Sequence, residues 1–142
     1  MISNHYTDPS GKQLVQRVPV AGTWKNVRDY AGYDYLCARL NTTHDDGTPH
    51  AGDGSHDGDI GGGQFLNACV WFETMTGISC LDIDYIPEYK TSAVIGDELM
   101  SLLHVVKTEN GYTLDPEFAA LLRQAAHDAV AEAGYTVVER SK

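Results

Sequence analysis

Four side chains able to do acid-base or metal chemistry are crowded near the middle of the chain. Residues 51–77 read AGDGSHDGDIGGGQFLNACVWFETMTG and place Asp53, His56, Asp57 and Asp59 within seven positions. An aspartate three residues before a histidine, on a turn that contains glycine, can accept a hydrogen bond from imidazole Nδ1–H. This contact fixes the tautomer and leaves Nε2 free to take a proton from a nucleophile. Asp53 and His56 are therefore a candidate orienting carboxylate and general base.

The same acidic segment has two other interpretations. A solvated acidic loop is what its composition alone favours. A metal site is the third interpretation, but calcium loops need alternating carboxylates with a distal bidentate glutamate, and zinc sites favour histidines at fixed spacing. The segment HDDGTPHAGDGSHDGD meets neither pattern, so we expect no metal and no cofactor.

The residues after the glycines are expected to hold this loop in place. Apolar side chains recur at helical spacing and Gly77 suits the end of a helix, so the pattern predicts a buried helix over residues 62–76. Within it we expect Trp71, Phe72 and Cys69 in the core and Glu73 on the helix surface, with a role in shaping a pocket beside the buried aromatic residues as the alternative for Glu73.

The remaining pattern predicts a mixed α/β fold. A short strand of parallel type is expected over residues 15–21, ended by Gly22, and an irregular stretch is expected from Trp24 to Gly63 apart from one helical turn. Further helices are predicted over residues 92–106 and 116–133, the latter opened by Asp115 and Pro116, with a last strand starting at residue 135.

Isolated polar residues outside the acidic segment have simpler interpretations. We expect His104 and His127, both within predicted amphipathic helices, to have structural roles. Arg28 could bind an acidic substrate group, but a surface ion pair is the favoured interpretation.

Composition limits the class of protein. A chain of 142 residues with 42% hydrophobic content suits a single domain over residues 1–142. Its net charge of -10 argues against nucleic acids and anionic membranes as partners. The three cysteines have no CxxC spacing, which indicates neither a disulfide framework nor a zinc ribbon. No segment has the pattern of a secretory signal or a membrane span.

Several of these motifs together resemble a known superfamily. Asp53-Gly54-Ser55-His56, then Gly61 and the helix FLNACVWFETMTG, resemble the last block of the SGNH (GDSL-like) hydrolases, whose signature there is Asp-x-x-His before a helix. The continuation WFETMTG looks like an uncharacterised bacterial branch of that superfamily. RVPVAGTWKNVR is similar to the strand and loop before the block in that branch, so the resemblance covers roughly residues 14 to 90.

The resemblance implies a three-layer α/β/α fold with a parallel sheet, of which this chain would be the C-terminal portion. It also implies a serine nucleophile, an oxyanion hole made by Ser, Gly and Asn, and hydrolysis of acyl or acetyl esters, often on carbohydrate. His56 would be the general base and Asp53 its orienting partner, with a small-molecule or carbohydrate ester as substrate and no cofactor.

The sequence departs from the superfamily at the nucleophile. The Gly-Asp-Ser block and the two oxyanion blocks are not found, and Ser3 and Ser10 lack the motif. We therefore expect either the Asp/His half of a longer hydrolase or, alternatively, a non-catalytic binding or interaction module on a degenerate hydrolase scaffold.

Overall fold

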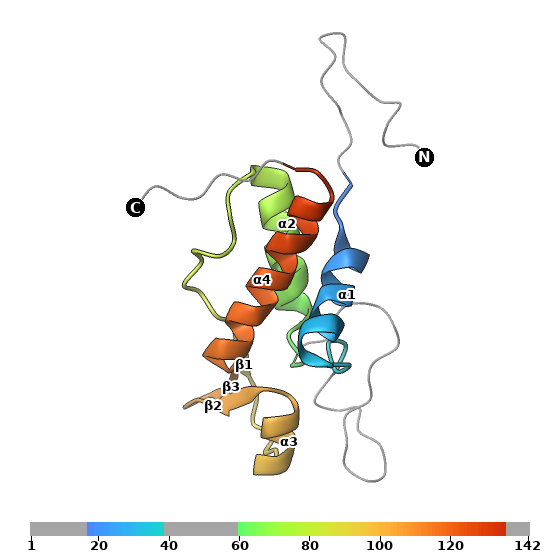
Figure 1. The fold of residues 1–142 in the computed structure, drawn as a ribbon. Helices are drawn as coiled ribbons and strands as arrows, with labels where there is room; N and C mark the ends of the chain where they lie inside the picture. The colour runs from blue at the N-terminus through green and yellow to red at the C-terminus, as the bar shows by residue number, and fades with distance from the viewer. Residues whose placement is uncertain (1–16, 39–59, 136–142) are drawn as a thin grey trace.

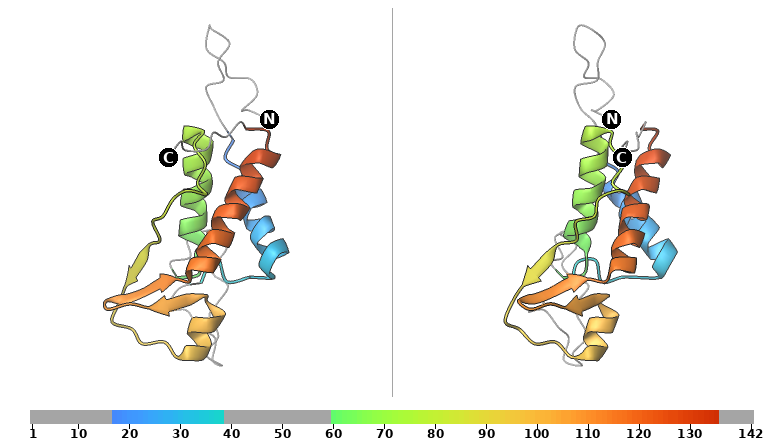
Figure 2. Two further views of the ribbon diagram at one scale, coloured as in Figure 1. Left: turned by 60° about the vertical axis from the view of Figure 1, so that its left-hand side comes forward. Right: turned by 90° about the vertical axis from the view of Figure 1, so that its left-hand side faces the viewer.

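The computed structural model describes residues 17–38 and 60–135 (Figure 1), and it shows a mixed α/β fold. The elements in chain order are α1 (Val20–Ala31), α2 (Gly63–Thr76), β1 (Glu88–Lys90), α3 (Asp97–Leu102), β2 (Val105–Lys107), β3 (Gly111–Leu114) and α4 (Pro116–Glu132). Helix α4 packs against both α1 and α2, and the small sheet lies with α3 at one end of these three helices (Figures 1 and 2).

The strand predicted over residues 15–21 is not seen in its described part, residues 17–21, because α1 begins at Val20. Pro19 is its N-cap, and Thr23, Trp24 and Val27 are buried at helical spacing. Gly22 lies inside the helix, where an added Cβ would come 3.7 Å from the Ala129 Cβ of α4. The prediction was wrong because the segment from Val20 forms a helix that packs against α4, and Gly22 lies inside this helix in ordinary contact with Ala129. The stretch after Trp24 is likewise helical as far as Ala31.

Helices α2 and α4 confirm two of the predicted elements. Gly77 ends α2 in the left-handed conformation, with φ of 70°, and its N–H donates to the Glu73 carbonyl. At the start of α4, Asp115 Oδ1 accepts hydrogen bonds from the backbone N–H groups of Glu117 (3.0 Å) and Phe118 (3.1 Å). Capping residues of this kind define helix ends through local chemistry, which is why the sequence located both helices well.

The sheet corrects two predictions. Its order is β1-β3-β2 and both pairings are antiparallel, so the parallel strand expected from sequence has no counterpart in the described residues. The helix predicted over residues 92–106 begins only at Asp97. It ends at Leu102, because Val105 and Val106 pair with Leu114 and Thr113 instead. β-branched side chains suit a pleated strand, and here the pairing outweighs the helical spacing of the leucines.

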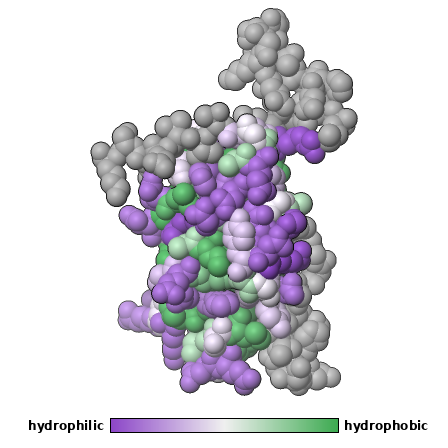
Figure 3. Space-filling view, in the orientation of Figure 1, coloured by the Kyte–Doolittle hydropathy of each residue, from purple (hydrophilic) through white to green (hydrophobic). Residues whose placement is uncertain are grey.

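A hydrophobic core runs from the three long helices into the sheet. Its largest fully buried side chains include Tyr112, Leu36, Ile60, Leu66, Leu103, Leu114 and Leu122. Trp71, expected in the core, is 51% exposed, and Phe72 is only partly buried. On the face seen in Figure 3, hydrophobic side chains gather among hydrophilic ones in the middle and at the sheet end. No helix in the described ranges is long and apolar enough to cross a membrane.

Candidate functional site

The predicted catalytic pair falls outside the described residues. Asp53 and His56, together with Asp57 and Asp59, lie within residues 39–59. The described chain resumes at Ile60, which is buried, and leads directly into α2.

A turn of glycines anchors the start of α2 against the segment after α1. A Cβ on Gly61 would come 1.7 Å from the Tyr35 carbonyl oxygen, and one on Gly63 would come 2.2 Å from the Leu36 carbonyl oxygen. Real Cβ atoms never approach backbone so closely, so only glycine fits at these two positions. The backbone that follows the acidic segment is therefore held in one place by direct contact.

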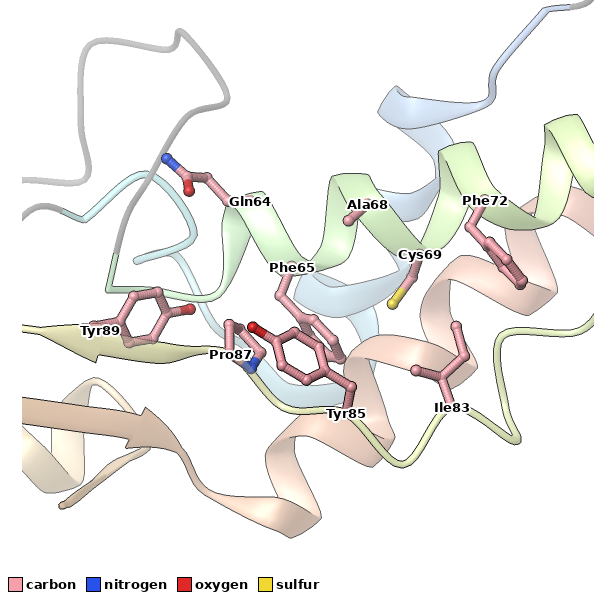
Figure 4. Close-up of a pocket in the computed structure, with 9 residues that line it drawn as sticks. All are labelled: Gln64, Phe65, Ala68, Cys69, Phe72, Ile83, Tyr85, Pro87 and Tyr89. Atoms are coloured by element: carbon pink, nitrogen blue, oxygen red, sulfur yellow. The ribbon is translucent and has the colours of Figure 1, made fainter.

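An apolar pocket lies beside α2. It has a volume of 360 Å³, within the range of small-molecule sites, and is lined by Gln64, Phe65, Ala68, Cys69, Phe72, Ile83, Tyr85, Pro87 and Tyr89. Figure 4 shows that one wall comes from α2 and the other from the segment that leads into β1. Gln64 and Phe65 lie in the first turn of α2. The pocket therefore reaches the N-terminal end of α2, and the acidic segment comes just before this end in the sequence.

The second wall was missed by sequence analysis, although a signal for it exists. Its residues Ile83, Tyr85, Pro87 and Tyr89 alternate along the chain. Alternate residues of an extended segment point to the same side, so this spacing indicates a common face.

Arg123 of α4 supports both walls from inside the protein. Its guanidinium carbon lies 5.5 Å from the centroid of the Phe65 ring, and its Nη2 donates to the Tyr85 carbonyl oxygen at 3.3 Å. The side chain is 9% exposed. A buried cation over an aromatic face is a favourable contact, so Arg123 fixes Phe65 and Tyr85 relative to each other.

Glu73 is the main correction at this site. The sequence placed it on the helix surface, but it is buried between α2 and α4. Its Oε2 accepts the backbone N–H of Cys80 at 2.7 Å, and its Oε1 lies 2.8 Å from His127 Nδ1. A buried carboxylate requires such partners. His127 therefore has the expected structural role, because it ties α4 to α2.

Two thiols lie next to this carboxylate. Cys69, on α2, lines the pocket and is buried as predicted, whereas Cys80 is fully buried behind it. A hydrogen bond from the Cys80 thiol lowers the pKa of Cys69, assisted by the charge of Arg123 and opposed by burial and by the charge of Glu73. The same hydrogen bond, together with burial, raises the pKa of Cys80. Of the two thiols, the one that faces the pocket is thus the one that ionises more readily.

The other polar predictions can be placed in the structure. Arg28 forms the expected surface ion pair with Asp34, with 3.2 Å from Nε to Oδ1. Ser79 Oγ accepts the Leu81 N–H, and no described serine hydroxyl is hydrogen-bonded to a described histidine. Within the same ranges no group of three acidic, histidine or cysteine side chains could hold a metal ion.

His104 lies in the turn after α3 rather than inside a helix. Its φ of 52° is in the left-handed region, and its ring stacks on Phe118 at a centroid distance of 4.3 Å. Burial against this ring lowers the pKa of His104, and the charge of Asp115 opposes the shift only in part. The fold therefore favours the neutral imidazole.

We expect a proton NMR titration to give His104 a pKa below the ordinary value of 6.5. Because the unfolded chain binds this proton more readily, the stabilisation is complete above about pH 6.5 and is lost as the pH falls through the lowered pKa. His104→Asn, which also tolerates a positive φ, should make the loss of stability between pH 7 and pH 5 shallower. A pKa at or above 6.5 would show that Asp115 outweighs burial.

No family model, curated protein or solved structure matches the chain, so the resemblance to SGNH hydrolases depends on the residues quoted for it.

Proposed function

We propose that this chain is the C-terminal, base-supplying portion of an SGNH-type serine ester hydrolase with a three-layer α/β/α fold. The observation that carries the proposal is the position of the pocket. The Asp53-x-x-His56 block precedes α2 by a few residues, and the first turn of α2 lines an apolar pocket of 360 Å³. A base and a binding pocket at the start of one helix are the parts that ester hydrolysis requires from this half of a site.

In the proposed reaction His56 takes a proton from a serine hydroxyl as that serine attacks the ester carbonyl. Asp53 accepts the hydrogen bond from Nδ1–H and stabilises the imidazolium that forms. His56 then returns the proton to the leaving alcohol, and a water molecule releases the acyl group by the same route. The serine and the oxyanion donors come from a nucleophile block outside the sequence given.

The pocket would take the apolar part of the ester. Phe65, Phe72 and Ile83 offer contact to an acyl chain or an aromatic alcohol, and Tyr85, which is 69% exposed, offers a flat ring at the mouth for a sugar. The glycine turn at 61–63 holds the start of α2, which gives the preceding base a fixed attachment.

We expect the chain of 142 residues alone to hydrolyse p-nitrophenyl acetate no faster than free imidazole and to take up no fluorophosphonate probe. The same chain joined to a polypeptide carrying the Gly-Asp-Ser block should label one serine and turn over the ester. Stoichiometric serine labelling of the chain alone would contradict the claim that the nucleophile lies on another polypeptide segment. An inactive joined protein would contradict the proposed hydrolase activity.

A non-catalytic binding module is the second candidate, because the pocket is complete within the described residues while no described serine is paired with a described histidine. Filling the pocket separates the candidates. Ala68→Trp, with exposed Ala120→Trp of α4 as its control, should lower hydrolysis of apolar esters in the joined enzyme. If the joined protein is inactive and Ala68→Trp abolishes binding of an apolar fluorescent probe, the binding module is correct.

A further inference from the structure

We propose that Cys69 and Cys80 form a redox-active pair in which a hydroperoxide enters the apolar pocket, oxidises Cys69, and is resolved by Cys80 to a disulfide. This is a modification site separate from ester hydrolysis, and it uses only residues that the structure describes. It needs no serine, no acidic segment and no second polypeptide.

The two sulfurs differ in access. Cys69 lines the pocket, and Figure 4 shows its sulfur pointing toward the side where Ile83 and Tyr85 lie. Cys80 does not line the pocket and has no exposed surface. A small oxidant in the pocket therefore meets Cys69 first, and Cys80 can react only from the interior.

Glu73 fixes the position of the second thiol. It follows Cys69 by one helical turn, so the two side chains share a face of α2. Its Oε2 holds the backbone N–H of Cys80 at 2.7 Å, which sets the chain of Cys80 against this face. The Cys80 side chain therefore lies next to Cys69, and the two thiols are within hydrogen-bonding distance of each other.

The protonation states of the reduced pair suit first attack by Cys69, the thiol with the lower pKa. The single Cys80 proton has two acceptors, the Arg123 carbonyl oxygen at 3.4 Å and the Cys69 sulfur. When Cys69 is ionised this proton stabilises the thiolate, as does the nearby guanidinium of Arg123. The thiolate is the form of cysteine that attacks peroxides.

The reaction balances with a hydroperoxide as oxidant. The Cys69 thiolate attacks the terminal peroxide oxygen, the O–O bond breaks, and an alkoxide or hydroxide leaves as Cys69 becomes a sulfenic acid. The Cys80 sulfur then attacks the sulfenic sulfur, so that the S–S bond forms and the S–O bond breaks. The Cys80 proton leaves with the hydroxyl group as water. The product ties α2 to the segment after it and removes the thiolate from the pocket.

The test is to treat the reduced full chain with hydrogen peroxide, alkylate it under denaturing conditions and map its peptides by mass spectrometry. We expect a Cys69–Cys80 cross-linked peptide, while Cys37, a buried cysteine outside the pocket, stays free and serves as the internal control. Ala68→Trp should slow cross-linking at least about tenfold by closing access, and Ala120→Trp should not change it.

Two variants separate the roles of the thiols. Cys80→Ala should leave Cys69 as a sulfenic acid that dimedone traps, whereas Cys69→Ala should leave Cys80 unmodified, with folding checked by circular dichroism. If either cysteine variant unfolds, the rate of Cys69–Cys80 cross-linking in Ala68→Trp is the test, because this protein keeps both cysteines. Cross-linking as fast as in wild type would then contradict the proposal. Oxidation of Cys37 as fast as Cys69, or no cross-link at peroxide levels that oxidise free glutathione, would overturn the proposal.

Discussion

His56→Ala is expected to lower kcat/KM for ester hydrolysis by at least about a thousandfold in the joined enzyme that carries the nucleophile block. Members of a catalytic triad act as a unit, so the loss of the base removes most of the advantage that the serine brings. Asp53→Asn should cost less, since the imidazole remains but loses its orienting carboxylate. The measurement is turnover of p-nitrophenyl acetate, together with circular dichroism to confirm folding.

The control for this prediction comes from the same acidic stretch. His50→Ala removes a histidine six positions away that lacks an aspartate three residues before it, and it should leave turnover unchanged. Full activity of His56→Ala would rule out His56 as the base, whatever its effect on stability.

Glu73→Ala is expected to lower the free energy of unfolding by about 3 kcal/mol, a large fraction of what a domain of this size has. The substitution leaves the Cys80 N–H without its acceptor and His127 without its carboxylate, both next to the core. Glu73→Gln should lose less, because an amide oxygen can still accept one of these hydrogen bonds. Urea unfolding at pH 7 measures both variants.

Exposed Glu117→Ala, near the start of α4, is the control and should change stability by less than about 1 kcal/mol. A double-mutant cycle with His127→Ala isolates the pair itself and should give a coupling of about 1 to 3 kcal/mol. A Glu73→Ala protein as stable as wild type would show that water takes the place of the carboxylate as partner of the Cys80 N–H and of His127.

The sequence predicted the parts of the fold that are set by local chemistry. Helices α2 and α4 begin and end near the expected residues because Gly77 and Asp115 act on the backbone groups next to them. The strand expected before Gly22 and the long helix expected through Val106 were wrong for the opposite reason. The segment of the expected strand is helical where α1 packs against α4, which is distant in sequence, and the expected helix stops where Val105 and Val106 pair with β3 across a short turn.

The candidate site, too, has residues that the sequence could predict and residues that depend on packing. Asp53 and His56 can be singled out from their spacing alone, and they remain a prediction. The burial of Glu73 could not be predicted, because α2 has apolar side chains on several faces and only the packing of α4 decides which face is covered. Trp71, on another face of the same helix, is left exposed for the same reason.

The short sheet affects how copies of the protein behave at high concentration. Its outer strands β1 and β2 are three residues long, and each ends in a lysine, Lys90 and Lys107. An open strand edge invites a strand from another molecule, and short charged edges discourage this addition. Within the described sheet, both sides are therefore protected against the edge-to-edge aggregation that ends in amyloid-like fibres.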